Sequence, residues 1–223
     1  MTDINPAEIG AILFDMDGTL VDSDRAVERS WLAWAGEYGT DGPAAYAMAH
    51  GAPSLTTVRK LLGHRAEDEI QAAAARQLEL QYDDLDDVVA APGWTELSAV
   101  LKLPWAVVTS ADARLAKARL DAAGIAAPVL VTTDDVPAGK PDPAGYLRAA
   151  ELLGVPPENC LVVEDAEVGL AAARAAGAHT AALRGLDGDL RLGSLADLAD
   201  WLSGQVVQEG RGGHEEQRTG DRD

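Results

Sequence analysis

Two carboxylates stand one residue apart directly after a short apolar run. The run is Ala11-Ile12-Leu13-Phe14, and the acidic stretch that follows it is Asp15-Met16-Asp17-Gly18-Thr19-Leu20. An apolar run of this length, bounded by Gly10, predicts a strand that is buried on both faces, and Gly18 permits a tight turn after it. Paired carboxylates at such a position are costly unless a cation or hydrogen bonds compensate them. Mg²⁺ is the simplest compensating cation, because hard divalent ions prefer carboxylate oxygens.

The stretch by itself leaves two interpretations open. It is either a metal-binding acidic site or an acidic turn that caps the next helix. Asp-x-Asp-Gly also opens calcium loops, but those require a Glu at a fixed later spacing and helices on both sides. Here the preceding segment is a strand and no such Glu follows. Whether this stretch is a metal-binding site or a helix cap therefore depends on the rest of the chain.

Overall composition excludes several classes of function. The chain has 223 residues, with 18 basic and 37 acidic side chains and a net charge of −19. This charge disfavours binding to nucleic acid or to an anionic membrane surface and mildly favours a monomer. Residues 1–10 lack the basic and apolar regions of a signal peptide, and no apolar run approaches the roughly 20 residues that span a bilayer, so we expect a cytoplasmic protein. Cys160 is the single cysteine, which excludes an intramolecular disulfide, and its place beside an apolar run predicts a buried thiol.

The first third of the chain is predicted to be helical. Apolar periodicity and helix-ending glycines indicate four helices, near residues 22–39, 44–50, 54–62 and 66–82. The aromatic stripe of the first helix is typical of helix packing rather than of a ligand site. The acidic run at 83–87 is interpreted as a solvated linker, because its acids have neither a turn glycine nor an ordered spacing.

From residue 88 onward strands alternate with helices. Strands are expected at the apolar runs 105–109, 128–131, 161–163 and 179–183, with helical segments between them. This alternation predicts an α/β protein in which a parallel sheet has helices on both faces. The expected domains are a core formed by residues 1–21 and 88–203, and an inserted helical domain at 22–87. The polar, glycine-bearing tail at 204–223 is expected to be disordered.

Polar side chains follow the ends of these strands. Thr109 and Ser110 follow one strand, Lys140 comes after the next, and Glu164 and Asp165 follow a third. Ligands of open parallel sheets bind outside the carboxyl ends of the strands, so we expect these residues to converge on the first acidic stretch. Each piece is ordinary alone, as a loop lysine, a helix cap or a turn. Together, acids with a cation, a lysine and a hydroxyl suit phosphoryl transfer.

The same four segments resemble the motifs of the haloacid dehalogenase superfamily of phosphohydrolases, in family order. The resemblance covers about residues 9–203 and implies a Rossmann-like core with an inserted alpha-helical cap. It implies that Asp15 is the nucleophile and that Asp17 is the general acid and base. It further implies a phosphate site formed by Thr109, Ser110 and Lys140. It also implies a Mg²⁺ site formed by Asp15, Asp17 (through its carbonyl), Glu164 and Asp165. Asp17 argues against dehalogenation, because the dehalogenase branch has no acid two residues after its nucleophile.

Within the superfamily the chain is most similar to sugar- and polyol-phosphate phosphatases. The residues that show this similarity include Asp22-Ser23 and His50-Gly51. The chain differs from that branch at Ala52, where a basic residue is often found. His50 is a candidate substrate contact; a packed helix-end histidine is the alternative. The leading hypothesis is a Mg²⁺-dependent phosphatase of small phosphorylated metabolites that acts through an aspartyl phosphate. The alternatives are a hexose-phosphate mutase similar to beta-phosphoglucomutase and, less favoured, a non-catalytic phosphometabolite-binding protein.

Overall fold

The computed structural model describes residues 4–49 and 51–204 of the chain and contains a six-stranded parallel sheet. The strand order is β5-β4-β1-β6-β7-β8, and every neighbouring pair is parallel. The predicted α/β class and parallel sheet are therefore confirmed. The strands are β1 (Ala11–Phe14), β4 (Trp105–Val108), β5 (Leu130–Val131), β6 (Cys160–Glu164), β7 (His179–Ala182) and β8 (Leu190–Arg191).

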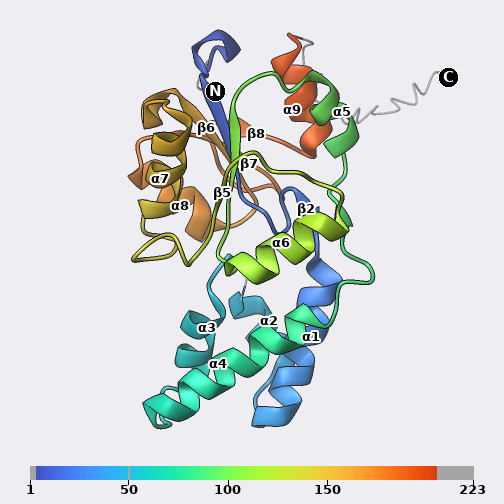
Figure 1. The fold of residues 1–223 in the computed structure, drawn as a ribbon, viewed down its shortest axis with the longest axis vertical. Helices are drawn as coiled ribbons and strands as arrows, with labels where there is room; N and C mark the ends of the chain where they lie inside the picture. Colours follow the sequence, from blue (N-terminus) through green and yellow to red (C-terminus); the bar gives the residue numbers. More distant parts are fainter. Residues whose placement is uncertain (1–3, 50, 205–223) are drawn as a thin grey trace, which may run out of the picture.

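Helices cover both faces of the sheet (Figure 1). One face carries α7 (Ala144–Leu153) and α8 (Glu167–Ala175), and the other carries α5 (Trp94–Val100), α6 (Ala113–Ala122) and α9 (Leu195–Leu202). The central strand β1 shows how one strand contributes to the apolar core on each face of the sheet. Ala11 and Leu13 join the core under α7 and α8, while Ile12 and Phe14 join the core on the opposite face. Because side chains alternate along a strand, a continuous apolar run supplies two cores at once.

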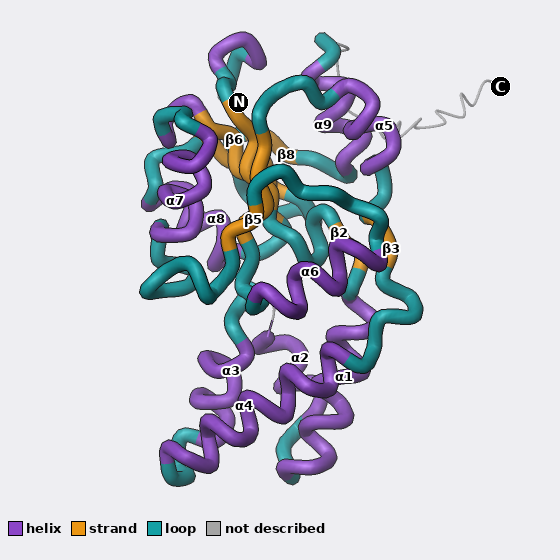
Figure 2. The backbone as a smooth tube through the Cα atoms, viewed as in Figure 1, coloured by secondary structure: helices purple, strands orange, loops and turns teal. Residues whose placement is uncertain are grey.

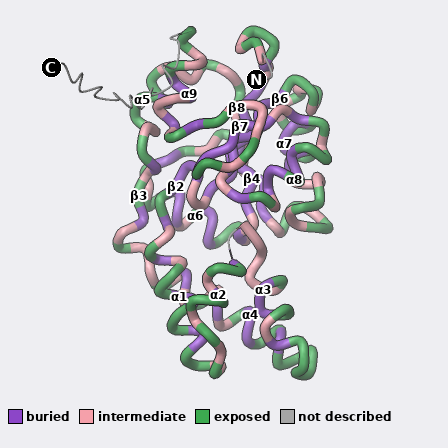
Figure 3. Tube along the Cα trace, turned by 180° about the vertical axis from the view of Figure 1, so that it is seen from behind, coloured by how far each residue is buried: buried purple, intermediate pink, exposed green. Residues whose placement is uncertain are grey.

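Burial follows the same division of the molecule. The strands of the sheet are mostly buried, while each covering helix turns one side toward solvent (Figure 3). Cys160 is buried at the start of β6 as a free thiol, as predicted. Two short 3₁₀ helices, η1 (Pro6–Glu8) and η2 (Pro157–Asn159), complete the described core.

Four further helices form a separate layer beyond the carboxyl ends of the strands (Figure 2). They are α1 (Asp24–Tyr38), α2 (Gly42–Ala49), α3 (Ser54–Leu62) and α4 (Glu67–Tyr82), and we refer to them as the helical unit. The chain enters this unit through β2 (Val21–Asp22) and leaves it near β3 (Val89–Ala90). These two short strands pair in antiparallel fashion. Neither was predicted.

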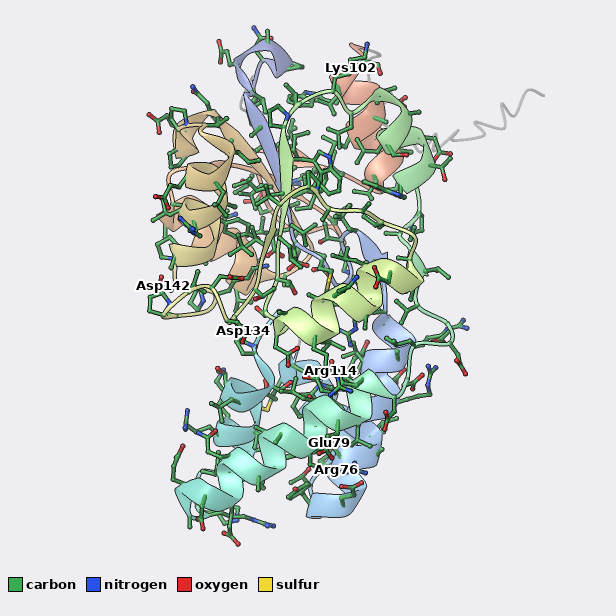
Figure 4. The ribbon with its side chains drawn as sticks, viewed as in Figure 1. Arg76, Glu79, Lys102, Arg114, Asp134 and Asp142 are labelled. Carbon is green, nitrogen blue, oxygen red and sulfur yellow. The ribbon has the colours of Figure 1, made fainter. Side chains whose placement is uncertain are left out.

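The helical unit has its own apolar core. Trp31 and Trp34 are buried, and their rings meet edge to face with centroids 5.3 Å apart. The indole N–H of Trp34 donates to the Ala73 carbonyl at 2.8 Å, which ties α1 to α4. The prediction that the aromatic stripe serves helix packing rather than a ligand site is confirmed for Trp34. The opposite side of α4 is exposed, and there Arg76 pairs with Glu79 (Figure 4).

Several contacts join the helical unit to the core. The Tyr82 hydroxyl donates to the Asp112 carboxylate, and the Arg114 guanidinium lies 4.0 Å from the centre of the Tyr82 ring. Arg114 reaches from α6 toward α4 (Figure 4). Helices α4 and α6 are therefore in direct contact beside the carboxyl edge of the sheet.

The acidic run after α4 is not merely solvated. Asp84 and Asp87 both accept hydrogen bonds from the Arg29 guanidinium, with the closest N–O distances at 2.6 Å. The run is a partly exposed linker, and two of its acids also bind the first helix of the unit, because an arginine with a planar fork can serve two carboxylates.

Within the described part of the chain, no helix is both long and apolar enough to cross a lipid bilayer. The predicted disordered tail falls, beyond Gly204, outside the described residues. The expectations of a monomer, of a cytoplasmic location and of no nucleic-acid partner stay predictions.

Candidate active site

The acidic residues predicted from separate motifs lie together at the carboxyl edge of the sheet. Strands β1 and β6 are neighbours with Phe14 opposite Val163, so Asp15 and Glu164 leave the sheet side by side. Asp165 is the next residue. One carboxylate oxygen from each of Asp15, Glu164 and Asp165 lies within 4.8 Å of the others. The predicted convergence of these three residues is therefore what the structure shows.

Lys140 inserts its ammonium group between two of these acids. Its Nζ donates to Asp15 and, at 2.6 Å, to Glu164 Oε1, and the lysine side chain is 5% exposed. The loop after β5 thus delivers one buried positive charge to the acidic cluster. A buried lysine is stable only with such partners, because burial otherwise disfavours the charged form.

Glu164 is held from every side. Its Oε1 accepts from Lys140 and from the Tyr146 hydroxyl at 2.7 Å, and its Oε2 accepts from the backbone N–H groups of Asp165 and Ala166, both at 3.1 Å. The side chain is fully buried. Gly169, on the first turn of α8, leaves the space that this carboxylate occupies, since a Cβ there would lie 1.5 Å from Oε1.

Asp165 is balanced by a second cation. The Arg184 Nε donates to Asp165 Oδ2 at 2.8 Å, and the same guanidinium also pairs with Asp24 at the start of α1. Gly18 makes this approach possible. Its φ of +82° is open to glycine, and a Cβ there would meet Asp165 Oδ2 at 2.1 Å.

Burial and crowding shape the electrostatics of this cluster. Burial, reinforced by the charge of Glu164, raises the pKa of Asp165 to about 7. Burial raises the pKa of Asp15 as well, against the opposing attraction of Lys140. Burial alone would lower the pKa of Lys140, but the charges of Asp15 and Glu164 raise it above its ordinary value. The three acids therefore favour further positive charge beyond that supplied by the lysine.

The carboxylate of Asp17 is held by two groups outside this cluster. Its Oδ1 accepts from the Ser23 hydroxyl at 2.6 Å, and its Oδ2 accepts from Arg119 Nη1 at 2.7 Å. Ser23 is the residue that precedes α1, a position where a serine hydroxyl often caps the helix. The Ser23 hydroxyl makes no capping bond and binds Asp17 instead.

The sequence did not single out Arg119. It lies inside an ordinary amphipathic helix, α6, with no motif around it, yet its side chain is 2% exposed. Only the packing of α6 against α4 shows where the guanidinium goes. A buried arginine is rare unless it is paired, so its position on Asp17 is informative.

Thr109 and Ser110 lie at the end of β4, next to β1 in the sheet. The Thr109 hydroxyl accepts from the backbone N–H of Ala111 at 3.1 Å, and the Ser110 hydroxyl donates to the Gly51 carbonyl of the helical unit at 2.9 Å. Both residues border the same cavity as Asp15 and Asp17. His50, the candidate substrate contact, lies outside the described residues.

This cavity lies between the carboxyl edge of the sheet and the helical unit. It has about 690 Å³ of empty space, open to solvent. The floor includes Asp15, Asp17, Ser110 and Asp165. Polar and apolar side chains of the helical unit form the roof: Asp24, Val27, Trp31, Tyr46, Ser54, Leu78 and Gln81. Trp31 therefore serves both the core of the helical unit and the wall of the cavity.

The donor set at the floor fits a magnesium ion. Mg²⁺ prefers hard oxygen ligands and binds one or two carboxylates together with substrate phosphate oxygens. Asp15 and Asp165 border the cavity with carboxylates close enough to share one ion. Glu164 already accepts four hydrogen bonds, so it contributes charge and geometry more than free lone pairs.

Comparison with known proteins places the chain in a family. Residues 9–177 match the family model described as haloacid dehalogenase-like hydrolase. The chain is 41% identical to hexitol phosphatase A of Escherichia coli (strain K12) over 175 residues, 77% of this chain and 81% of that protein. It is 34% identical to 2-deoxyglucose-6-phosphate phosphatase 1 of Saccharomyces cerevisiae over 189 residues, 75% and 77% of the two chains.

The fold comparison agrees with this result. The structure of beta-phosphoglucomutase from Clostridium difficile superposes with a TM-score of 0.77 over 88% of this chain and 98% of that chain, at 19% sequence identity. That identity supports the shared fold alone. The chain belongs to the haloacid dehalogenase-like hydrolase family, as the motifs indicated. Within that family it is a phosphoric monoester hydrolase, the class of the two relatives described above.

Proposed function

We propose that this protein hydrolyses small sugar or polyol phosphates through an aspartyl-phosphate intermediate. The observation that carries the proposal is the arrangement at the cavity floor. Asp15 is buried next to Lys140 at the same opening where Asp17 borders the cavity. A nucleophile, a phosphate-binding cation and an acid–base group thus share one site.

In the first half of the reaction, a carboxylate oxygen of Asp15 forms a bond to phosphorus while the bond to the alcohol oxygen breaks. The departing oxygen takes a proton from Asp17. In the second half, Asp17 accepts a proton from water, whose oxygen attacks phosphorus and releases Asp15 and inorganic phosphate. Lys140, Thr109 and Ser110 would hold the phosphoryl oxygens through these steps. Mg²⁺ bound by Asp15, Asp165 and the Asp17 carbonyl would supply positive charge that the phosphate dianion requires.

The roof of the cavity supports a sugar or polyol as the leaving group. The polar side chains of Asp24, Tyr46 and Ser54 border the cavity beside the apolar face of Trp31, and such a mixed lining suits a leaving group with hydroxyls on a carbon chain. The curated relatives point the same way, since hexitol phosphatase A and 2-deoxyglucose-6-phosphate phosphatase 1 are named for such substrates.

The test is phosphate release from a panel of hexitol, hexose, glycerol and nucleotide monophosphates, with Mg²⁺ and with a chelator. We expect chelator-sensitive release from a small group of sugar or polyol phosphates. Release of phosphate from none of them would refute the proposal, and interconversion of hexose phosphates without phosphate release would replace it by a mutase.

The nucleophile is tested by Asp15→Asn. We expect turnover to fall below detection while the fold is kept, because the amide has the same size and Glu164 remains as a partner of Lys140. Asp68→Asn is the matched control, since Asp68 is exposed on α4 away from the cavity. Activity of Asp15→Asn near that of the control would refute the nucleophile assignment.

A further inference from the structure

Arg119 is buried against the group proposed as the acid and base. Its side chain is 2% exposed, Nη1 donates to Asp17 Oδ2 at 2.7 Å, and Nη2 donates to Gln81 Oε1 at 2.7 Å. Asp17 and Arg119 are 102 positions apart in the sequence. A desolvated guanidinium is retained only where its partners are well placed, so this contact is a built feature of the fold rather than a surface ion pair.

The two bonds to Asp17 fix its carboxylate group. Ser23 holds Oδ1 and Arg119 holds Oδ2, so rotation of the carboxylate about its terminal torsion would break both bonds. A guanidinium has donors and no acceptor, so the oxygen that faces Arg119 has to act as an acceptor. The oxygen facing the Ser23 hydroxyl is then the one able to carry a proton, because a hydroxyl can both donate and accept.

Gln81 connects this arrangement to the helical unit. It lies at the C-terminal end of α4 and is 6% exposed. Its amide nitrogen donates to Gln77 Oε1 and, at 3.3 Å, to the Ser54 hydroxyl, which itself donates to Gln77 at 2.6 Å. Ser54 begins α3 and borders the cavity. A continuous chain of hydrogen bonds therefore runs from the roof of the cavity through Gln81 and Arg119 to Asp17.

We propose that Arg119 is a positioning residue for Asp17, and that Gln81 makes this position depend on the placement of α4. The inference rests on the proposed function, since it assigns Arg119 to the acid–base group of that reaction. Arg119 does not touch the phosphoryl group in this scheme. It holds Asp17 so that one oxygen is directed at the oxygen of the departing alcohol, and it does so only when α4 lies against α6.

The test compares two phosphate esters that differ in their need for an acid. A hexitol phosphate releases an alkoxide that has to be protonated, whereas p-nitrophenyl phosphate releases a stable phenolate that does not. The quantity measured is kcat/KM, because it covers the steps up to release of the alcohol or phenol and leaves out hydrolysis of the aspartyl phosphate. The variants are Arg119→Met, Arg119→Lys and Gln81→Met, with Lys117→Met as the control. Lys117 lies on the same helix, its side chain is 73% exposed, and it pairs with Asp121 rather than with Asp17.

We expect Arg119→Met to lower kcat/KM for the hexitol phosphate by roughly 10- to 100-fold, the scale of a misplaced catalytic group, and for p-nitrophenyl phosphate by less than about threefold. Arg119→Lys should recover part of the loss, because an ammonium keeps the charge but not the fork. Gln81→Met should show the same preference for the nitrophenyl ester with a smaller loss. Lys117→Met should leave both values unchanged.

Equal losses for the two esters, or no loss for either, would overturn the inference. If Arg119→Met fails to fold, as judged by circular dichroism, the same comparison with Arg119→Lys and Gln81→Met decides the matter. A wild-type protein that releases phosphate from none of the esters of the substrate panel would refute the proposed function itself. If the wild type hydrolyses both esters and the variants lose kcat/KM equally for the two, only the role of Arg119 is refuted.

Discussion

Gly169 is the position where a single methyl group should do the most damage to the site. A Cβ at Gly169 would lie 1.5 Å from Glu164 Oε1 and 2.0 Å from its carboxylate carbon, so Glu164 has to move in Gly169→Ala. That carboxylate accepts bonds from Lys140, Tyr146 and two backbone N–H groups in a fully buried place. Its displacement leaves buried charges without their partners.

The magnitude follows from opposing terms. Alanine in a helix is favoured over glycine by about 1 kcal/mol. Breaking a buried, hydrogen-bonded charge pair costs about 3–5 kcal/mol. The net loss in the free energy of unfolding is therefore about 2–4 kcal/mol, a large part of the roughly 5–15 kcal/mol typical of a native protein. We also expect loss of phosphatase activity, because Lys140 loses one of its two anchors.

The assay is urea unfolding followed by circular dichroism, with Gly36→Ala as the matched control. Gly36 lies within α1, is exposed, and has no atom within 4 Å of an added Cβ. The control should be as stable as the wild type or more stable by up to about 1 kcal/mol. If Gly169→Ala behaved like Gly36→Ala, the claim that Glu164 is fixed in this place would be wrong.

Three further predictions concern stability. Burial raises the pKa of the Cys160 thiol to about 11, whereas the thiol of an unfolded chain has a pKa of about 8.5. The stability of the wild type should therefore fall relative to that of Cys160→Ala as the pH rises from about 8.5 to 11. Equal urea midpoints for the two proteins across that range would contradict this prediction. Ser194→Ala should lower the free energy of unfolding by about 1 kcal/mol, because the Ser194 hydroxyl caps α9 by accepting from the Ala196 N–H at 3.2 Å. An unchanged melting temperature would show that the cap is unimportant. Trp34→Phe should cost about 1 kcal/mol in urea unfolding, because it removes the indole N–H bond to the Ala73 carbonyl that joins α1 to α4. A neutral result would mean that this bond contributes nothing.

The sheet and the helices were predictable from the sequence where periodicity is strong. The buried runs at β1, β4, β6 and β7 appeared as apolar segments between turn signals, and the helices of the core appeared between them. The short strands β2, β3 and β8 could not be found in this way. Two residues carry no periodicity by themselves, and the pairing of β2 with β3 joins segments that are distant in the sequence.

The same contrast holds for the candidate site. Asp15, Glu164 and Asp165 were placed together correctly because the ends of parallel strands meet at one edge. Arg119 was missed, since its function depends on which way α6 turns against α4. Local rules favour a capping role for the Ser23 hydroxyl, which precedes α1, but the nearby carboxylate of Asp17 is a stronger, charged acceptor. Local patterns identify the residues attached to strand ends; the partners supplied by distant helices follow only from the packing.

The paired strands β2 and β3 have a consequence for how this protein can change over time. Val21 lies opposite Ala90 and Asp22 lies opposite Val89, so the inserted helices start and finish at neighbouring points of the chain. Adjacent strands lie only about 5 Å apart, so a segment of different length or shape can be joined at the same two points without redirecting the sheet. Recombination at this junction can therefore replace the roof of the cavity as one module, and selection can alter substrate preference while the strand ends below retain their chemistry.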